Sequence, residues 1–154
     1  MVKSKESRSK RRPAIGWREW VQLPDLNVPA IKAKVDTGAR SSALHAFDVA
    51  IEGDVPKREV SFIVHPFQGG SGQAIACRAA LLEQRWVKSS NGVRELRPVI
   101  RTRLGLMGDT WDIDLTLTSR DAMGFRMLLG REAIRGRFLV NPGKSFRAKA
   151  FLPS

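Results

Sequence analysis

Hydrophobic and polar positions alternate along most of the chain, in short segments. The clearest is Thr110 to Thr118, where Trp111, Ile113, Leu115 and Leu117 alternate with polar residues. A period of two is typical of a strand with one buried face. Related patterns predict strands over residues 14–23, 28–35, 43–51, 59–64, 85–88, 93–103, 125–129 and 138–140. Only residues 131–135 fit a helix, a short one that Gly136 would end. The sequence therefore predicts a mainly β fold with one short helix.

Two turn sequences connect neighbouring predicted strands into hairpins. Pro24-Asp25-Leu26-Asn27 separates residues 14–23 from residues 28–35, and these residue types favour turns. Ser89-Ser90-Asn91-Gly92 separates residues 85–88 from residues 93–103. Asn-Gly is the strongest short-range signal for a tight hairpin turn.

The predicted strand 28–35 ends directly before Asp36-Thr37-Gly38, our candidate for a working site. Asp36 leaves the strand at its carboxyl end, so the strand would present its carboxylate on rigid scaffolding. Gly38 permits tight-turn backbone angles and a close approach of another backbone or a substrate. The alternative interpretation is a turn in which Asp36 only caps the local backbone, as aspartate often does.

Length and cysteine content predict a single domain without disulfides. The chain has 154 residues, enough to bury a sizeable core, and one cysteine, Cys77, which cannot form an internal disulfide. No apolar run approaches the ~20 residues that cross a bilayer. The N-terminus has the charges of a signal peptide but not its apolar middle. We therefore expect a cytoplasmic protein that does not bind membranes.

The net charge of +12 is concentrated partly at the start of the chain. Six cations stand there against Glu6 alone: Lys3, Lys5, Arg8, Lys10, Arg11 and Arg12. We expect residues 1–13 to be a disordered basic tail, ahead of a folded domain over residues 14–154. The tail is either a solvated arm or an electrostatic anchor to the ribosome or RNA, and the sequence leaves both open.

Beyond the tail, arginine outnumbers lysine. Guanidinium groups pair bidentately with carboxylates, whereas lysine would serve equally well for solubility alone. An arginine-rich cleft would suit an acidic peptide. Any single arginine is also consistent with a solvated surface charge.

Asp36-Thr37-Gly38-Ala39, followed later by Leu128-Leu129-Gly130-Arg131, resembles the two motifs of retropepsin-like aspartic proteases. The flanking sequences are more specifically similar to a bacterial branch labelled "ATP-dependent zinc protease" and associated with ATP-grasp glutamate ligases. The resemblance covers residues 15–142. It implies a closed acid-protease barrel, in which the hairpin around Ser89 and Ser90 is the flap that closes over the substrate; the sequence alone also fits an ordinary hairpin.

Amide hydrolysis by carboxylates needs two of them sharing one proton. The chain has one Asp-Thr-Gly, so this mechanism requires a homodimer in which each copy contributes Asp36. The resemblance implies that Thr37 bonds across the dimer and that Gly38 leaves room for the substrate. It also implies an oligoglutamate substrate. The cations that could hold it are Arg85, Arg97, Arg120, Arg126 and Arg131.

Metal and nucleotide motifs are weak. The possible zinc ligands His45, His65 and Cys77 have irregular spacing, and Asp112 and Asp114 could reflect simple alternation. The stretch 69–72 is glycine-rich but lacks the Gly-Lys ending of a phosphate loop. The sequence therefore predicts no cofactor. Two alternatives to the aspartic endopeptidase stay open: a non-catalytic basic module for the ribosome or RNA on the same scaffold, and a zinc-dependent hydrolase.

Overall fold

The computed structural model describes residues 12–67, 73–89, 91–120 and 124–148. Most of the expected tail, Ser90 and the glycine-rich stretch lie outside these residues. The described part contains twelve strands, one 3₁₀ helix (Pro24–Leu26) and one α-helix, α2 (Arg131–Ile134). The strands are β1 Ala14–Ile15, β2 Arg18–Leu23, β3 Val28–Val35, β4 Ser42–His45, β5 Phe47–Glu52, β6 Glu59–Val64, β7 Ile75–Ala80, β8 Glu83–Lys88, β9 Arg94–Leu106, β10 Asp109–Thr118, β11 Met127–Leu129 and β12 Leu139–Val140. The predicted mainly β class is confirmed.

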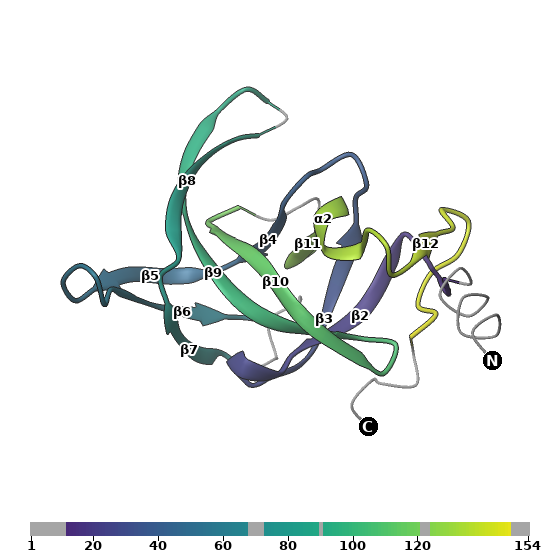
Figure 1. Ribbon diagram of the computed structural model, residues 1–154, viewed down its shortest axis with the longest axis horizontal. Coiled ribbons are helices and arrows are strands. Elements are labelled where there is room, and N and C mark those ends of the chain that lie inside the picture. Colours follow the sequence, from purple (N-terminus) through teal and green to yellow (C-terminus); the bar gives the residue numbers. More distant parts are fainter. Residues whose placement is uncertain (1–11, 68–72, 90, 121–123, 149–154) are drawn as a thin grey trace, which may run out of the picture.

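The largest sheet has seven strands in the order β10-β4-β11-β3-β2-β9-β8, and β10 also pairs with β9. This additional pairing joins the strands from β10 round to β9 into a ring of six neighbours. β8 pairs only with β9 in this sheet, so the β8–β9 hairpin extends beyond the ring, and Figure 1 shows it arching away from the other strands. The core fills the ring with fully buried side chains such as Ile31, Leu104 and Leu115.

β11 occupies a central position between β3 and β4. It runs parallel to β3, with Leu129 opposite Val35, and antiparallel to β4, with Met127 opposite Leu44. Two segments far apart in the sequence, the end of β3 and the Leu-Leu-Gly segment, are thereby side by side. Because β11 lies next to the end of β3, the two motifs are neighbours in the fold.

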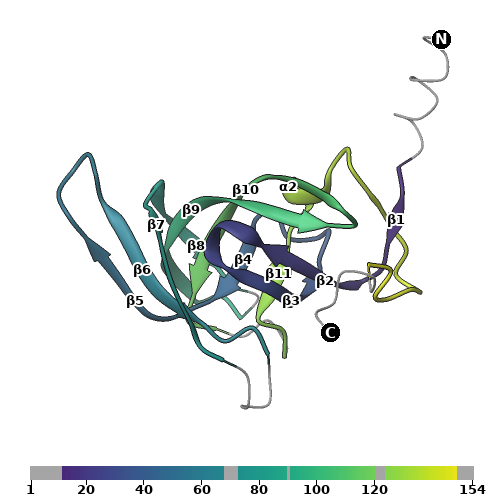
Figure 2. The ribbon, with the colours of Figure 1, turned by 90° about the horizontal axis from the view of Figure 1, so that it is seen from below.

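A second, three-stranded sheet is formed by β5, β6 and β7. Figures 1 and 2 place it at one end of the molecule and the β1–β12 pair at the other. Val60, Phe62 and Val64 of β6 are buried and belong to the same hydrophobic core as the ring.

Two predicted strands were each divided in the structure, and one strand was not predicted. The predicted strand 14–23 divides into β1 and β2 at Gly16, whose backbone lies so close to the Lys144 carbonyl that no side chain would fit. The predicted strand 43–51 divides into β4 and β5, which belong to different sheets. β7 was not predicted, because its small residues show little alternation. Within the described residues, no helix is long and apolar enough to cross a membrane.

A buried carboxylate fastens the C-terminal segment to β2. Glu19 is fully buried and accepts hydrogen bonds from the backbone N–H groups of Gly16, Arg147 and Ala148 at 2.7–2.9 Å. Three N–H donors satisfy a charge that would otherwise be costly to bury. Glu19 therefore joins the start of the fold to its described end.

Candidate active site

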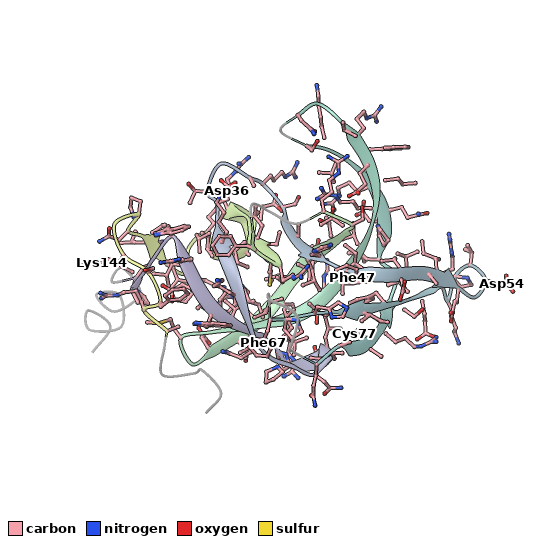
Figure 3. All side chains as sticks on the ribbon, turned by 180° about the vertical axis from the view of Figure 1, so that it is seen from behind. Asp36, Phe47, Asp54, Phe67, Cys77 and Lys144 are labelled. Carbon is pink, nitrogen blue, oxygen red and sulfur yellow. The ribbon has the colours of Figure 1, made fainter. Side chains whose placement is uncertain are left out.

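Asp36 is the first residue after β3, at the point where β11 lies alongside. Its backbone N–H donates to the Leu129 carbonyl at 2.9 Å, which continues the β3–β11 pairing by one residue. The residue is partly buried. In Figure 3 it lies on the side of the molecule toward which the β8–β9 hairpin projects. The strand thus presents the carboxylate at a fixed position next to solvent.

The loop after Asp36 folds back onto its own carboxylate. The Gly38 N–H donates to Asp36 Oδ1 at 2.9 Å, and the Ala39 N–H donates to the Asp36 carbonyl at 3.2 Å. A Cβ at Gly38 would come 3.2 Å from Oδ1, so glycine keeps the carboxylate uncrowded. The turn-capping role considered from the sequence is therefore present. It uses one carboxylate oxygen, and no other described residue donates to the side chain.

The junction between β11 and α2 supports the Asp36 loop through hydrogen bonds. The Arg131 N–H donates to the Ala39 carbonyl at 2.8 Å, and the Arg131 guanidinium donates to the Gly38 carbonyl at 3.3 Å. The Gly130 N–H donates to Ser42 Oγ at 3.1 Å. A Cβ at Gly130 would lie 2.6 Å from the Ser41 backbone, so only glycine allows this approach. The second motif is thus a structural support for the first.

The predicted hairpin is present as β8 and β9, with Lys88 opposite Arg94. Strand alternation places Glu83, Arg85, Glu95 and Arg97 on one face, where Arg85 lies directly opposite Arg97. We call this the inner face, because an Arg85 guanidinium N–H contacts Ser41 Oγ at 3.4 Å, near the Asp36 loop.

A hydrogen-bond network fixes the hairpin, close to its turn, to the end of β10. Glu95 accepts hydrogen bonds from Arg97 and Thr118 at 2.7 Å and from Ser119 at 3.0 Å. Arg97 also donates to Thr116 at 3.4 Å. Burial opposes ionisation of Glu95, but the hydrogen bonds outweigh it and hold the pKa of this carboxyl below its usual range. The Arg97 guanidinium is therefore already held by hydrogen bonds within the fold.

A polar pocket of about 360 Å³ lies between the hairpin base, β10 and α2. Its lining residues are Ser41, Ser42, Arg85, Arg101, Asp112, Ile113, Asp114, Glu132 and Ala133. Arg101 pairs with Asp114 at 3.0 Å, and Glu132 pairs with Arg40 at 2.6 Å. Arg85 has only longer contacts, to Glu83 at 3.2 Å and to Ser41. Arg85, which contacts Glu83 through two N–H groups at 3.2 and 3.4 Å, is therefore the pocket arginine with the longer ion pair.

The other expected substrate contacts are distributed differently. Arg120 donates to Ser89 at the hairpin tip at 3.5 Å, while Ser90 is outside the described residues. Arg126 precedes β11 at the end opposite Gly130, about 13 Å of extended chain away. Its guanidinium lies 2.9 Å from His45 Nδ1. The structure therefore groups Arg85 and Arg131 with the Asp36 loop, Arg97 with Glu95 and the end of β10, and Arg120 with the hairpin tip, and it separates Arg126.

The zinc alternative gains no support from the described residues, where no three His, Cys, Asp or Glu side chains converge. His45 and His65 both contact Phe47, with ring centroids 4.4 and 4.7 Å from it. Cys77 is buried near Leu26, and burial raises the pKa of its thiol to about 11. Cysteine binds zinc as a thiolate, and a thiol with a raised pKa is poorly suited to this role.

An open, mainly apolar hollow adjoins the other side of the loop at Thr37. Its volume is about 520 Å³, and its lining residues are Thr37, Arg131, Ile134, Arg135, Phe138, Leu139, Val140 and Pro142. Leu139 is 57% exposed, which is unusual for a leucine in a packed domain.

The polar residues that support the Asp36 loop were not predicted from the sequence. Ser41 and Ser42 follow the motif directly, and two hydroxyls ahead of an apolar strand were the available signal. Arg40 and Glu132 are 92 positions apart, so their ion pair could not be foreseen. Arg40 holds the pKa of the Glu132 carboxyl below its usual range.

Comparisons with known proteins identify relatives of this chain. The chain is 50% identical over 132 residues to a "Probable alpha-L-glutamate ligase" of Parasynechococcus marenigrum (strain WH8102) and 46% identical to one of Shewanella pealeana. These matches cover 86% of this chain but only 28% and 29% of the relatives, so the chain spans less than a third of their length.

The fold is similar to a crystal structure of Lpg0085, a protein of unknown function from Legionella pneumophila, with a TM-score of 0.72 and 25% identity. The alignment covers 90% of this chain and 99% of that one. A family model described as "Retropepsin-like aspartic endopeptidase RimB" matches residues 14–150. Since this match includes both motifs and nearly all of the described fold, the chain belongs to the RimB-like family of retropepsin-like proteins.

Proposed function

We propose that this chain is one subunit of a homodimeric aspartic endopeptidase that cleaves acidic, glutamate-rich peptides. The observation that carries the proposal is the Asp36 loop, which β11 and α2 hold from behind while one carboxylate oxygen accepts the Gly38 N–H. We also propose that the six-stranded ring is a closed barrel of the acid-protease type and that the protein works in the cytoplasm.

In the proposed reaction, two Asp36 carboxyl groups, one from each copy, hold one proton between them. The ionised group removes a proton from water, and the water oxygen bonds to the peptide carbonyl carbon. The protonated group gives its proton to the carbonyl oxygen, which produces a tetrahedral diol. The C–N bond then breaks as the protonated Asp36 gives its proton to the nitrogen and the ionised Asp36 takes one from a diol hydroxyl, so that the dyad again holds one proton. Two like charges this close cannot both ionise, so the pair titrates in coupled steps.

The face around Thr37 is the proposed contact between the two copies. Thr37 is exposed, and it borders the apolar hollow that contains Leu139 and Phe138. Burying this hollow against a second copy would remove apolar surface from water and bring the two Asp36 loops together. A monomer would have one motif carboxylate and could not share a proton in this way.

The acidic substrate preference is proposed from the inner face of the hairpin. Arg85 faces the pocket beside the loop and has only long polar contacts, so a substrate carboxylate could replace them. The relatives bear the name of a glutamate ligase, and most of each relative lies outside the match. A peptidase domain next to a glutamate ligase would act on the glutamate tails that the ligase produces.

Mixing subunits tests the shared dyad. Asp36→Asn keeps the acceptor for the Gly38 N–H but removes the acid, and we expect it to lower cleavage of a glutamate-tailed peptide about a thousandfold. Equal amounts of parent and Asp36→Asn chains, allowed to exchange, should retain about a quarter of the activity, because only parent–parent dimers are active. Retention of about half would indicate an independent active site in each chain. Asp109→Asn, at an exposed carboxylate, is the control.

The substrate preference has a separate test. Arg85→Gln should raise KM about tenfold for a glutamate peptide and little for the same peptide with glutamines, since one charge-assisted hydrogen bond is lost. Arg78→Gln on β7, an exposed arginine in ion pairs, is the matched control. Equal effects of Arg85→Gln on both peptides would refute the acidic preference but not the peptidase. Full activity of Asp36→Asn would refute the aspartic mechanism, whereas absence of cleavage by the parent dimer would leave the non-catalytic basic binding module.

A further inference from the structure

The face of the β8–β9 hairpin that points away from the Asp36 loop has an unusual composition. Its residues are Gln84, Trp86 and Lys88 on β8, opposite Pro98, Leu96 and Arg94 on β9. We call this the outer face. Both acids of the two strands' paired segment, Glu83 and Glu95, lie on the inner face because strand alternation separates the two sets. The outer face therefore carries cations without a neighbouring acid on either strand.

Trp86 is the most exposed large aromatic side chain among the described residues, at 58%. Its cross-strand partner Leu96 is 42% exposed, so the pair forms an apolar patch that the fold does not cover. The Arg94 guanidinium lies over the indole, 4.8 Å from the ring centroid. Neither Arg94 nor Lys88 forms an ion pair with any described residue. The outer face thus combines an exposed indole with two cations that have no ion-pair partner among the described residues.

We propose that the outer face is a binding site for single-stranded nucleic acid. A base can stack on the Trp86 indole or on the guanidinium plane of Arg94, while Lys88 and Arg94 contact the adjacent phosphates. The net charge of +12 favours the approach of a polyanion. This site is separate from the proposed peptidase cleft, which the inner face borders.

Nucleic acid fits these residues better than an acidic peptide does. A carboxylate chain would use the two cations but would gain little from an exposed indole and leucine. A nucleic acid has a flat base for the indole and a phosphate for each cation at every position of its chain. Arg85, the arginine proposed to hold an acidic peptide, is on the inner face instead.

Fluorescence anisotropy with a labelled single-stranded RNA of about twelve nucleotides tests the site on the full-length chain. Trp86→Ala should weaken binding about tenfold without altering the salt dependence, because stacking releases no counterions. Lys88→Gln and Arg94→Gln should each reduce the slope of log affinity against log salt by about 0.7. Trp86→Phe should retain most of the affinity, since the ring remains, but lose the quenching of indole fluorescence that RNA produces.

Arg137→Gln is the matched control. Arg137 lies over Trp111 at 4.5 Å, the same kind of pair, but the Trp111 indole N–H donates to the Ala133 carbonyl and its ring packs on Phe138. We expect Arg137→Gln to leave the affinity within about twofold of the parent. Thermal unfolding of each variant checks that the fold is intact.

Three outcomes would overturn the proposal. The first is parental RNA affinity in Trp86→Ala, which would place all binding elsewhere, for example on the basic N-terminal residues. The second is equal loss in Arg94→Gln and Arg137→Gln, which would indicate a response to net charge alone. The third is displacement of the RNA by an oligoglutamate peptide that Trp86→Ala no longer binds, which would assign the outer face to acidic peptides.

Discussion

The contact between Gly130 and the loop after the Asp-Thr-Gly motif predicts a large cost for one added methyl group. In Gly130→Ala, the new Cβ would lie 2.6 Å from the Ser41 carbonyl carbon and oxygen and 2.7 Å from the Arg40 carbonyl oxygen. These are backbone atoms, so no side-chain rotation relieves the contact. The two segments would have to separate by about 0.8 Å to reach the 3.4 Å of an ordinary contact.

Such a separation should destabilise the protein by about 3 kcal/mol. Forced expansion of a packed region costs about 1–3 kcal/mol. The Gly130–Ser42 and Arg131–Ala39 hydrogen bonds would lengthen as well, at about 1 kcal/mol each if lost. For a chain of this length, that free energy corresponds to a fall of roughly 6–12 °C in the unfolding midpoint.

Urea unfolding of Gly130→Ala against Gly136→Ala measures this effect. Gly136 has a φ of +79° and no atom within 4 Å of an added Cβ, so its substitution tests backbone strain without a collision, at about 1 kcal/mol. We expect Gly130→Ala to be the less stable variant by about 2 kcal/mol. Equal stability of the two variants would mean that β11 does not brace the loop as described.

Three further predictions concern Glu19, Glu95 and Cys77. Glu19→Ala should destabilise the protein by about 3 kcal/mol in urea unfolding, because three backbone N–H groups lose their acceptor; a change below about 1 kcal/mol would contradict the role of Glu19. The lowered pKa of Glu95 means that this group stabilises the fold above its ordinary pKa of 4.5, and that the contribution disappears as pH falls through the folded value. Acid unfolding of Glu95→Gln should therefore depend less on pH below about 4.5 than that of the parent. Cys77, with a pKa of about 11, should react with iodoacetamide at neutral pH only after urea unfolds the protein, and rapid labelling of the native state would be inconsistent with its burial.

Local signals predicted much of the strand content but not the sheet to which each strand belongs. The boundaries of β6 were predicted correctly because Val60, Phe62 and Val64 alternate without interruption. The segment 43–51 is apolar enough to predict one strand, but its chain passes from one sheet to another after His45, and local apolar content does not reveal that change. The ring itself depends on β10 pairing with both β4 and β9, which no local pattern records.

In the candidate site, too, contacts between sequence neighbours could be predicted, whereas contacts between distant residues could not. Asp36 and Gly38 were recognised because they are neighbours in the sequence, and their hydrogen bond depends only on that spacing. The supports of the loop, such as the Gly130–Ser42 bond, join residues 88 positions apart. Arginine content likewise identified a chemistry but not a position: Arg85 lies beside the loop, while Arg126 lies at the far end of β11.

The ring closes between β2 and β9 through very few backbone contacts, whereas Asp36 is held by several. β2 and β9 are joined at one residue pair, Gln22 with Gly105, where an added Cβ would lie 2.9 Å from the Gln22 side-chain oxygen. β9, by contrast, pairs with β10 over eight residue pairs and continues into the hairpin. The hairpin therefore moves with β10, to which Glu95 also fastens it, whereas Asp36 is fastened to β11. The position of the hairpin over the loop consequently depends on how β10 packs against β4, and this pairing, with the Thr116 hydroxyl donating to the Ser42 carbonyl at 3.0 Å, links the two halves of the proposed site.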